Sequence, residues 1–275
     1  MMHYVDEGAG DPVVMVHGNP SWSFYFRDLI KALKDDYRVI APDHVGMGLS
    51  DKPGDRAYRY TLKSRVDDLE AFLERLHINE NVTLVLHDWG GMIGMAYACR
   101  HPERVKRLVI LNTAAFGLPP GKKLPGALRL CRDSKLGALL VRGFNAFSLG
   151  ATYLGARKMR PEIRRAYTAP YDSWANRIAT LRFVQDIPLS PKDESFEAVE
   201  NVQEGLQRFQ ATPMLICWGG KDFVFDEFFL QEWLRRFPKA DLHRFPEAGH
   251  YVLEDAGDEI SKLVRAFLES PSLSA

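Results

Sequence analysis

The sequence has little of what marks secreted proteins or cysteine metal sites. Its 275 residues include only three cysteines, Cys99, Cys131 and Cys217, which lie far apart and form no CxxC pair. An odd number of scattered cysteines favours buried, reduced thiols over a disulfide framework. The expected location of the protein is therefore the cytoplasm.

Long apolar runs and an excess of charge of one sign are also missing. No uncharged stretch reaches the roughly 18 apolar residues that would cross a membrane, and residues 1–8 lack the apolar region of a secretion signal. The 36 Lys and Arg residues balance 36 Asp and Glu residues, so the formal net charge is zero. This balance argues against electrostatic binding to nucleic acid or to an anionic membrane.

What the sequence does contain is an alternation of short β-branched runs and amphipathic helical stretches. Largely apolar runs such as residues 13–16, 82–86 and 213–217 predict buried strands. Leucines, valine and phenylalanine at helical spacing predict a long helix over residues 60–76. The pattern is typical of the α/β class, in which helices cover a mostly parallel sheet.

This alternation stops in the middle of the chain. Between residues 117 and 210 the sequence is mostly helical in character and is interrupted by seven prolines. We expect an inserted helical cap over 117–210, placed on a core that is made of residues 1–116 and 211–275. The chain begins close to its first expected strand, which leaves open whether an edge strand precedes it.

A sharp turn with an aspartate at its apex follows the strand predicted over residues 82–86. The turn has the sequence HDWGG and leads into an apolar helix, as in the nucleophile elbow of α/β-hydrolases. Gly90 and Gly91 give the strained backbone room, and Asp88 replaces the usual serine. The helix start favours the ionised carboxylate, which can attack a saturated carbon and form an alkyl ester. The alternative is that Asp88 merely caps the helix.

The other catalytic groups should follow the nucleophile in the order acid, then base. His250 lies just beyond the last predicted strand and is expected to act as a base toward water, unless it is a plain surface histidine. Asp222, after the preceding strand, is expected to orient it, and Asp226 competes for that role. Asn112 ends the strand before the cap and cannot serve as an acid, which strengthens the case for Asp222.

Two residues beside the nucleophile are predicted to bind an anion. The turn HGNP follows the strand over residues 13–16, and the backbone N–H groups of Asn19 and Trp89 are placed to form an oxyanion hole. Their side chains are donors that could hold a departing anion. The alternatives are a turn-stabilising role for Asn19 and core packing for Trp89. No cofactor or metal is expected.

Three segments resemble the haloalkane dehalogenase family of α/β-hydrolases. They are residues 17–23 (HGNPSWS), 43–51 (DHVGMGLSD) and 87–91 (HDWGG), and the resemblance extends over nearly the whole chain, cap included. In that family an aspartate attacks a carbon–halogen bond while an asparagine and a tryptophan bind the halide.

The resemblance implies a role for each matching residue. It implies that Asp88 is the nucleophile, that Asn19 and Trp89 hold the leaving group, and that His250 is the base with Asp222 as its acid.

Two further segments resemble one branch of that family, the β-lactone decarboxylases of bacterial long-chain olefin biosynthesis. They are residues 111–116 (LNTAAF) and 169–177 (APYDSWANR). The resemblance implies a cis-3-alkyl-4-alkyl β-lactone as substrate, with a cis-alkene and carbon dioxide as products. It also implies an assembly with a lactone-forming ligase, for which the apolar residues 137–150 offer a contact surface.

The cap supplies the predicted substrate pocket. Phe144 and Phe147 suit an alkyl chain, although packing between cap and core explains them equally well, and Trp174 of the resembling segment is also expected to line the pocket.

Three other functions stay open. A haloalkane dehalogenase would use the same residues hydrolytically. An epoxide hydrolase would need cap tyrosines as ring-opening acids, for which Tyr153, Tyr167 and Tyr171 are available. A non-catalytic binding protein of this fold would have no need for the complete set of nucleophile, acid and base.

Overall fold

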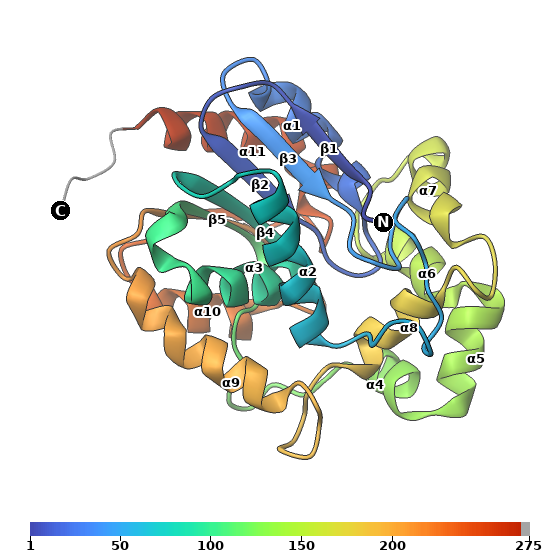
Figure 1. Ribbon diagram of the computed structural model, residues 1–275. Helices are drawn as coiled ribbons and strands as arrows, with labels where there is room; N and C mark the ends of the chain where they lie inside the picture. The colour runs from blue at the N-terminus through green and yellow to red at the C-terminus, as the bar shows by residue number, and fades with distance from the viewer. Residues whose placement is uncertain (271–275) are drawn as a thin grey trace.

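Seven strands form the central sheet, in the order β1-β3-β2-β4-β5-β6-β7 (Figure 1). The computed structural model describes residues 1–270. β1 pairs antiparallel with β3 at one edge, and all other neighbouring strands are parallel, which confirms the predicted mostly parallel sheet. The strands are β1 (Tyr4–Glu7), β2 (Pro12–Val16), β3 (Arg38–Pro42), β4 (Val82–Asp88), β5 (Val105–Thr113), β6 (Met214–Gly219) and β7 (Asp241–Phe245).

Helices bury both faces of this sheet, which explains the uninterrupted apolar runs in the central strands. Along β2, Val13 and Met15 face one apolar cluster while Val14 and Val16 face the other. The first cluster is covered by α1 (Arg27–Leu33) and α11 (Val252–Glu269), and the second by α2 (Leu62–Arg75), α3 (Trp89–Arg100) and α10 (Glu227–Arg236).

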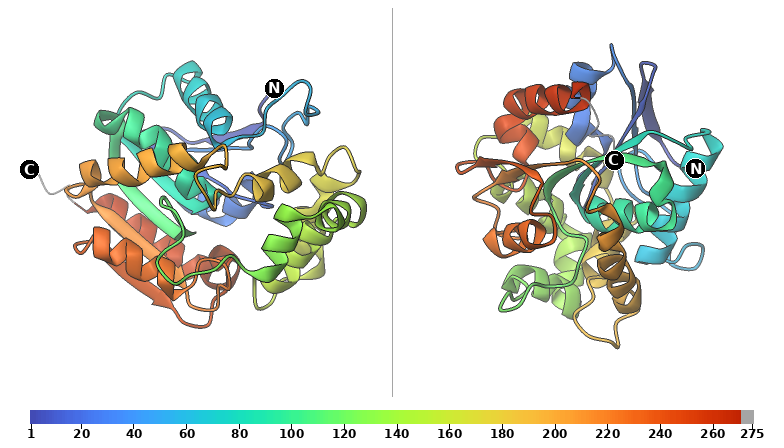
Figure 2. Two further views of the ribbon diagram at one scale, coloured as in Figure 1. Left: turned by 90° about the horizontal axis from the view of Figure 1, so that it is seen from below. Right: turned by 90° about the vertical axis from the view of Figure 1, so that its left-hand side faces the viewer.

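The helical insertion between β5 and β6 lies beside the core (Figures 1 and 2). Helices α4 to α8 form this group, whereas α9 packs against α3 of the core. The cap boundaries therefore stay a prediction, since the last predicted cap helix joins the core layer. The inserted helices are α4 (Gly126–Asp133), α5 (Lys135–Phe144), α6 (Ala146–Leu154), α7 (Pro161–Thr168), α8 (Ile178–Gln185) and α9 (Phe196–Gly205).

A buried ion pair joins the cap to the core. Nη1 of Arg65, on α2, lies 2.7 Å from Oδ2 of Asp186, which directly follows α8, and the two side chains are 1% and 6% exposed. The Arg65 guanidinium also lies 3.8 Å over the ring of Phe183, and that ring meets the indole of Trp89 edge to face at 5.5 Å. These contacts place α8 above the start of α3.

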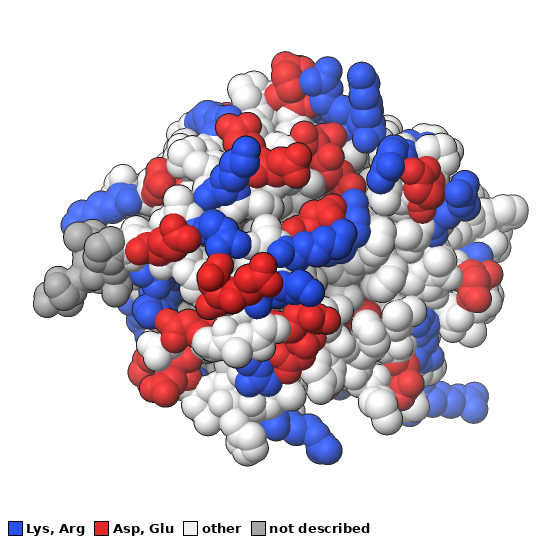
Figure 3. All heavy atoms as spheres, turned by 90° about the horizontal axis from the view of Figure 1, so that it is seen from above, with Lys and Arg blue, Asp and Glu red and all other residues white. Residues whose placement is uncertain are grey.

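Charged side chains are mixed in sign over the face shown in Figure 3. Within residues 1–270, no helix combines the length and the apolar character that a membrane span requires.

Candidate active site

Asp88 sits where β4 ends and α3 begins, with φ +52° and ψ −128°. Such a backbone costs a non-glycine residue about 1–3 kcal/mol and persists only where the surroundings enforce it. Close packing enforces it here. A Cβ atom on Gly90 would lie 1.9 Å from the carbonyl oxygen of Val16, and one on Gly91 would lie 1.9 Å from Oγ1 of Thr113. The two glycines are thus required by the turn, as the sequence pattern predicted.

One oxygen of the Asp88 carboxylate is held in place by a backbone donor. The N–H of Asn19 donates to Oδ1 at 2.6 Å, and the backbone N–H of Trp89 at the start of α3 also lowers the pKa of this carboxyl. Gly18 closes the same side, because a Cβ there would lie 2.0 Å from Oδ1. The backbone N–H of Asn19, predicted for an oxyanion hole, therefore binds Asp88 itself, and the Oδ2 oxygen faces His250.

Burial sets the protonation behaviour of Asp88. Removal from water raises the pKa of this carboxyl, while the nearby His250 and the backbone N–H groups of Asn19 and Trp89 lower it, with a net rise. The donors thus offset part of the cost of burying an ionised nucleophile.

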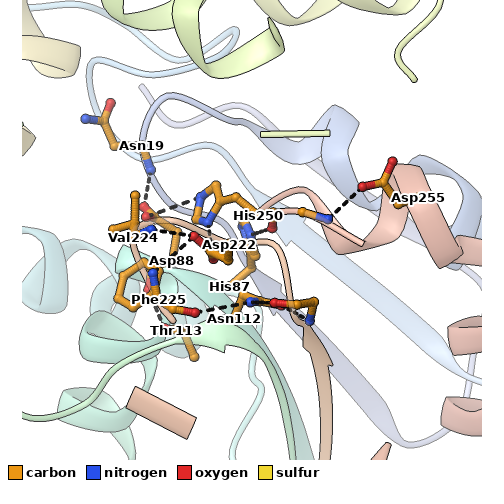
Figure 4. Close-up of polar contacts among 12 residues, drawn as sticks. Asn19, His87, Asp88, Asn112, Thr113, Asp222, Val224, Phe225, His250 and Asp255 are labelled. Carbon is orange, nitrogen blue, oxygen red and sulfur yellow. Dashed lines mark hydrogen bonds and ion pairs between the residues drawn. The ribbon is translucent and has the colours of Figure 1, made fainter. Parts of the chain in front are cut away.

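His250 lies between two carboxylates (Figure 4). Its Nδ1 is 2.8 Å from Oδ2 of Asp222, and its Nε2 is 3.6 Å from Oδ2 of Asp88. Burial alone would lower the pKa of His250, but Asp222 and then Asp88 outweigh it, so this pKa is raised. The structure brings together the three residues that were predicted as nucleophile, acid and base.

Asp222 and its competitor are separated by the structure. Oδ1 of Asp222 accepts the backbone N–H groups of Val224 and Phe225 at 2.7 and 3.1 Å, which fixes the carboxylate toward the histidine. Asp226 instead caps α10 and forms an ion pair with Lys122. It takes no part in the site.

Two residues that support this geometry were not predicted from the sequence. His87 is stacked on Tyr25, and its Nε2 lies 2.9 Å from the carbonyl oxygen of His250. Asn112 exchanges two hydrogen bonds with the backbone of Gly219, at 2.7 and 3.0 Å, and so ties β5 to the end of β6. His87 lies inside the elbow motif, but nothing in the sequence indicates which backbone group it contacts.

The side chains of Asn19 and Trp89 both line a cavity beside Asp88. Nδ2 of Asn19 donates to the carbonyl oxygen of Thr180 at 3.0 Å, which uses one of its two hydrogens. Among residues 1–270, the indole N–H of Trp89 has no hydrogen-bond partner. The guanidinium carbon of Arg65 lies 5.5 Å from the indole ring, on α2. The cavity wall beside Asp88 therefore holds two side chains that can donate a hydrogen bond to a ligand, and the charge of Arg65 behind the indole is balanced by Asp186.

The cavity has a volume of about 360 Å³ and is polar only near its base. Asp88, His250 and Asn19 stand there, and the rest of the wall is almost entirely apolar. Phe147 of α6 belongs to this wall, as predicted, together with Leu128 of α4. A site of this kind suits a large apolar ligand with one reactive polar group.

Two predicted pocket residues lie outside the cavity. Phe144, the last residue of α5, is 67% exposed, and Trp174 is 51% exposed with the Arg142 guanidinium 4.5 Å over its ring. Phe144 lies outside the cavity because Asn145, the next residue, has a φ of +54°, which ends α5 and turns the chain. After that turn Phe147 points inward, three residues beyond a phenylalanine that points outward.

The three cap tyrosines also stay outside the lining residues of the cavity. Tyr153 is exposed, Tyr167 donates to Glu254, and Tyr171 donates to the carbonyl oxygen of Ser21. None is placed as a ring-opening acid, which argues against an epoxide hydrolase. Within residues 1–270, no group of three or more His, Cys, Asp or Glu side chains could hold a metal ion.

Comparisons with known proteins agree with this architecture. Residues 11–257 match the family model described as alpha/beta hydrolase fold. The chain is 59% identical to a cis-3-alkyl-4-alkyloxetan-2-one decarboxylase of Shewanella oneidensis, over 97% of this chain and 85% of that protein. It is 51% identical to a protein of the same name from Xanthomonas campestris pv. campestris, over 98% and 92%.

A solved structure with a similar fold is that of the haloalkane dehalogenase DatA from Agrobacterium tumefaciens. It superposes with a TM-score of 0.86, at 25% identity, over 97% of this chain and 92% of that one.

Proposed function

The chain belongs to the α/β-hydrolase fold family, and within that family we propose that it is a β-lactone decarboxylase. Its substrate is a cis-3-alkyl-4-alkyloxetan-2-one, which it converts into a cis-alkene and carbon dioxide. The observation that carries this assignment is the 59% identity to a decarboxylase of that name across nearly the whole chain. The apolar cavity, with its polar groups gathered at Asp88, fits such a substrate.

In the first step, the free Oδ2 of Asp88 attacks C4 of the lactone ring, the carbon that bears the ring oxygen. A bond forms between Oδ2 and C4, and the C4–O bond breaks, so the ring oxygen leaves as part of a carboxylate on C3. The donors of Asn19 and Trp89 lie beside this position and are proposed to hold that carboxylate.

In the second step, the electron pair of the bond between C3 and the carboxylate forms the C3–C4 double bond. Carbon dioxide is released, and the ester bond breaks to return the electron pair to Oδ2 of Asp88. Inversion at C4 places the ester oxygen opposite the bond to the carboxylate, so the two alkyl groups end up cis. Atoms and charge balance without water.

The proposed role of His250 differs from that of a water-activating base. Asp222 raises its pKa, and a cation 3.6 Å from Oδ2 of Asp88 stabilises this carboxylate as it leaves in the second step. The hydrogen bond from the Asn19 N–H to Asp88 and the nearby backbone N–H of Trp89, which both lower the pKa of Asp88, act in the same direction.

The assay that tests the assignment uses a synthetic cis-3,4-dialkyl β-lactone beside 1,2-dibromoethane. We expect cis-alkene and carbon dioxide from the lactone in many turnovers, with little bromide from the haloalkane. Bromide release without alkene would overturn the proposal. Asp88→Ala, which removes the nucleophile, should abolish either reaction.

The second candidate function is that of a haloalkane dehalogenase. It is favoured by one observation, the full set of Asp88, His250 and Asp222 at distances that also suit hydrolysis of an alkyl ester. The 25% identity to the dehalogenase structure is far below the 59% identity to the decarboxylase, and this ranks it second.

We further propose that the enzyme works in the cytoplasm and assembles with a ligase that forms its lactone. A lactone with two long chains has low solubility in water, so an enzyme that consumes it gains from lying close to the enzyme that makes it. Co-purification of the two proteins, followed by sedimentation of the mixture, tests the assembly, and two separate species would contradict it.

A further inference from the structure

The cap segment over residues 134–168, which contains α5, α6 and α7, concentrates positive charge. It has a single carboxylate, Glu162, in a chain whose charges balance as a whole. The whole-chain balance therefore says nothing about this face. Its seven cations are Lys135, Arg142, Arg157, Lys158, Arg160, Arg164 and Arg165.

Several of these cations are free to meet an outside partner. Within residues 1–270, Arg157 pairs with Glu247 and Arg160 with Glu162, whereas Lys135, Lys158 and Arg165 are exposed and form no ion pair. Their charge is not neutralised by the protein itself.

The same segment is rich in exposed apolar side chains. Of the fifteen large hydrophobic residues that are exposed in the described chain, six lie in these 35 residues. They are Leu136, Leu139, Phe144, Leu149, Tyr153 and Leu154.

The three helices that carry these side chains are neighbours, and one basic side chain contacts one of the apolar ones. α6 packs against both α5 and α7, and Leu149 and Tyr153 are one turn apart on α6. The Arg164 guanidinium of α7 lies 3.8 Å over the Tyr153 ring. Exposed leucines and aromatics with flanking arginines and lysines are the composition of helices that lie in a lipid–water interface.

This segment forms part of the cavity wall, through Leu140 of α5 and Phe147 and Leu154 of α6. Four large apolar residues both line the cavity and are exposed, namely Leu154 of the segment and Leu118, Leu130 and Phe223 outside it. The rim of the cavity therefore borders the segment at Leu154.

We propose that this face, residues 134–168, docks on an anionic lipid bilayer, from which the cavity takes up its substrate. Positive charge attracts the protein to anionic headgroups, while the leucines and aromatics enter the interface. The uptake of substrate from the bilayer rests on the proposed function, because a lactone with two alkyl chains would dissolve in lipid rather than in water.

The test measures co-sedimentation of the full chain with two kinds of vesicle, phosphatidylglycerol mixed equally with phosphatidylcholine, and phosphatidylcholine alone. We expect binding to the anionic vesicles that weakens with added salt. The triple variant Lys135→Gln, Lys158→Gln, Arg165→Gln should lower the partition coefficient about 100-fold, from the typical contribution of each basic residue near an anionic surface.

The matched control removes three exposed cations of the core that also form no ion pair, Arg75→Gln, Lys239→Gln and Lys262→Gln. This variant carries the same change in net charge and should bind as the wild type does. Equal loss in both triple variants, or no binding of the wild type to anionic vesicles, would overturn the proposal. So would a cap triple variant that still binds vesicles but no longer binds a purified lactone-forming ligase.

A second measurement separates this proposal from the assignment of the activity. Asp88→Asn, which removes the nucleophile, should bind the vesicles as the wild type does. If the wild type forms no alkene in any condition but still binds the vesicles, the decarboxylase assignment is contradicted and the docking proposal is not. Conversely, the cap triple variant should lose turnover of a long-chain lactone presented in vesicles but keep that of a short, water-soluble lactone.

Discussion

The backbone N–H of Asn19 donates a hydrogen bond to Oδ1 of Asp88 at 2.6 Å. This contact distinguishes the two oxygens of the proposed nucleophile before any substrate arrives. Oδ1 is held by the backbone, and Oδ2 faces His250. The bond that forms in the proposed reaction is thereby assigned to one oxygen, and the distance to His250 is set for that oxygen.

Gly18→Ala should inactivate the enzyme, because the added Cβ would lie 2.0 Å from Oδ1 of Asp88. A displacement of about 1 Å at a reacting group costs on the order of 100-fold in rate, so we expect kcat to fall at least that far. The control is Gly54→Ala, where a Cβ meets no atom within 4 Å. Circular dichroism should show that the loss of activity exceeds any loss of folded protein.

His250→Phe should separate the two candidate reactions. The proposed decarboxylation needs no water, so alkene should still form in many turnovers, slowed by the loss of the imidazole near Asp88. Hydrolysis of an alkyl ester without its base should stop after one turnover. Intact-protein mass spectrometry distinguishes these outcomes, and a stable stoichiometric adduct of the lactone would count against the decarboxylation route.

Asp222→Asn should lower the pKa of His250. In the folded protein burial lowers this pKa, but Asp222 contributes most to the opposing rise. A raised histidine pKa stabilises the fold fully below the unfolded value of about 6.5, and this stabilisation is lost as the pH rises through the folded pKa. The variant should therefore lose most stability on the acid side. Thermal unfolding across the histidine titration range checks the sign, and a larger loss at high pH would contradict it.

Gly150→Leu should shorten the chains that the enzyme accepts. Gly150 lines the cavity, and a Cβ there meets no atom within 4 Å, so the new side chain would occupy open space rather than unfold α6. Overfilling a pocket costs about 1–3 kcal/mol, so kcat/KM for a long-chain lactone should fall about 10- to 100-fold with a short one little affected. Gly257→Leu, equally unhindered on α11, is the control. An equal loss for both lactones would count against this location of the chains.

Arg65→Met should destabilise the fold by about 3–5 kcal/mol, since it leaves the buried carboxylate of Asp186 without its partner. Burial already raises the pKa of Asp186, and Arg65 is the largest opposing influence. The loss should shrink as the pH falls and Asp186 becomes protonated. Urea unfolding at two pH values measures this. The double variant with Asp186→Asn should recover part of the stability, and no recovery would show that the charge is not the cause.

The sequence was sufficient to predict those features for which a local pattern has one structural outcome. Apolar runs predicted the strands of the parallel sheet, and a glycine-flanked aspartate after one of them predicted the elbow at Asp88. The expected order of nucleophile, acid and base along the chain led to Asp222 and His250. In the structure His250 lies 2.8 Å from Asp222 and 3.6 Å from Asp88.

Sequence patterns failed where one backbone angle or one surface decides the outcome. Phe144 and Phe147 are the same residue type and lie three positions apart in the sequence. Asn145, in the left-handed conformation, turns the chain between them, so Phe144 is exposed and Phe147 lines the cavity. The basic face of residues 134–168 was missed because its cations are cancelled in the total by carboxylates elsewhere in the chain.

The cavity wall has a consequence for how such enzymes diversify. Asp88, Asp222 and His250 all follow strands of the core, whereas much of the wall that meets the substrate chains comes from α4, α5 and α6 of the insertion. Substitutions in these helices can alter which molecules enter without moving any reacting atom. The same three polar residues can therefore act on different substrates when one contiguous stretch of the gene, the one that encodes the insertion, is exchanged.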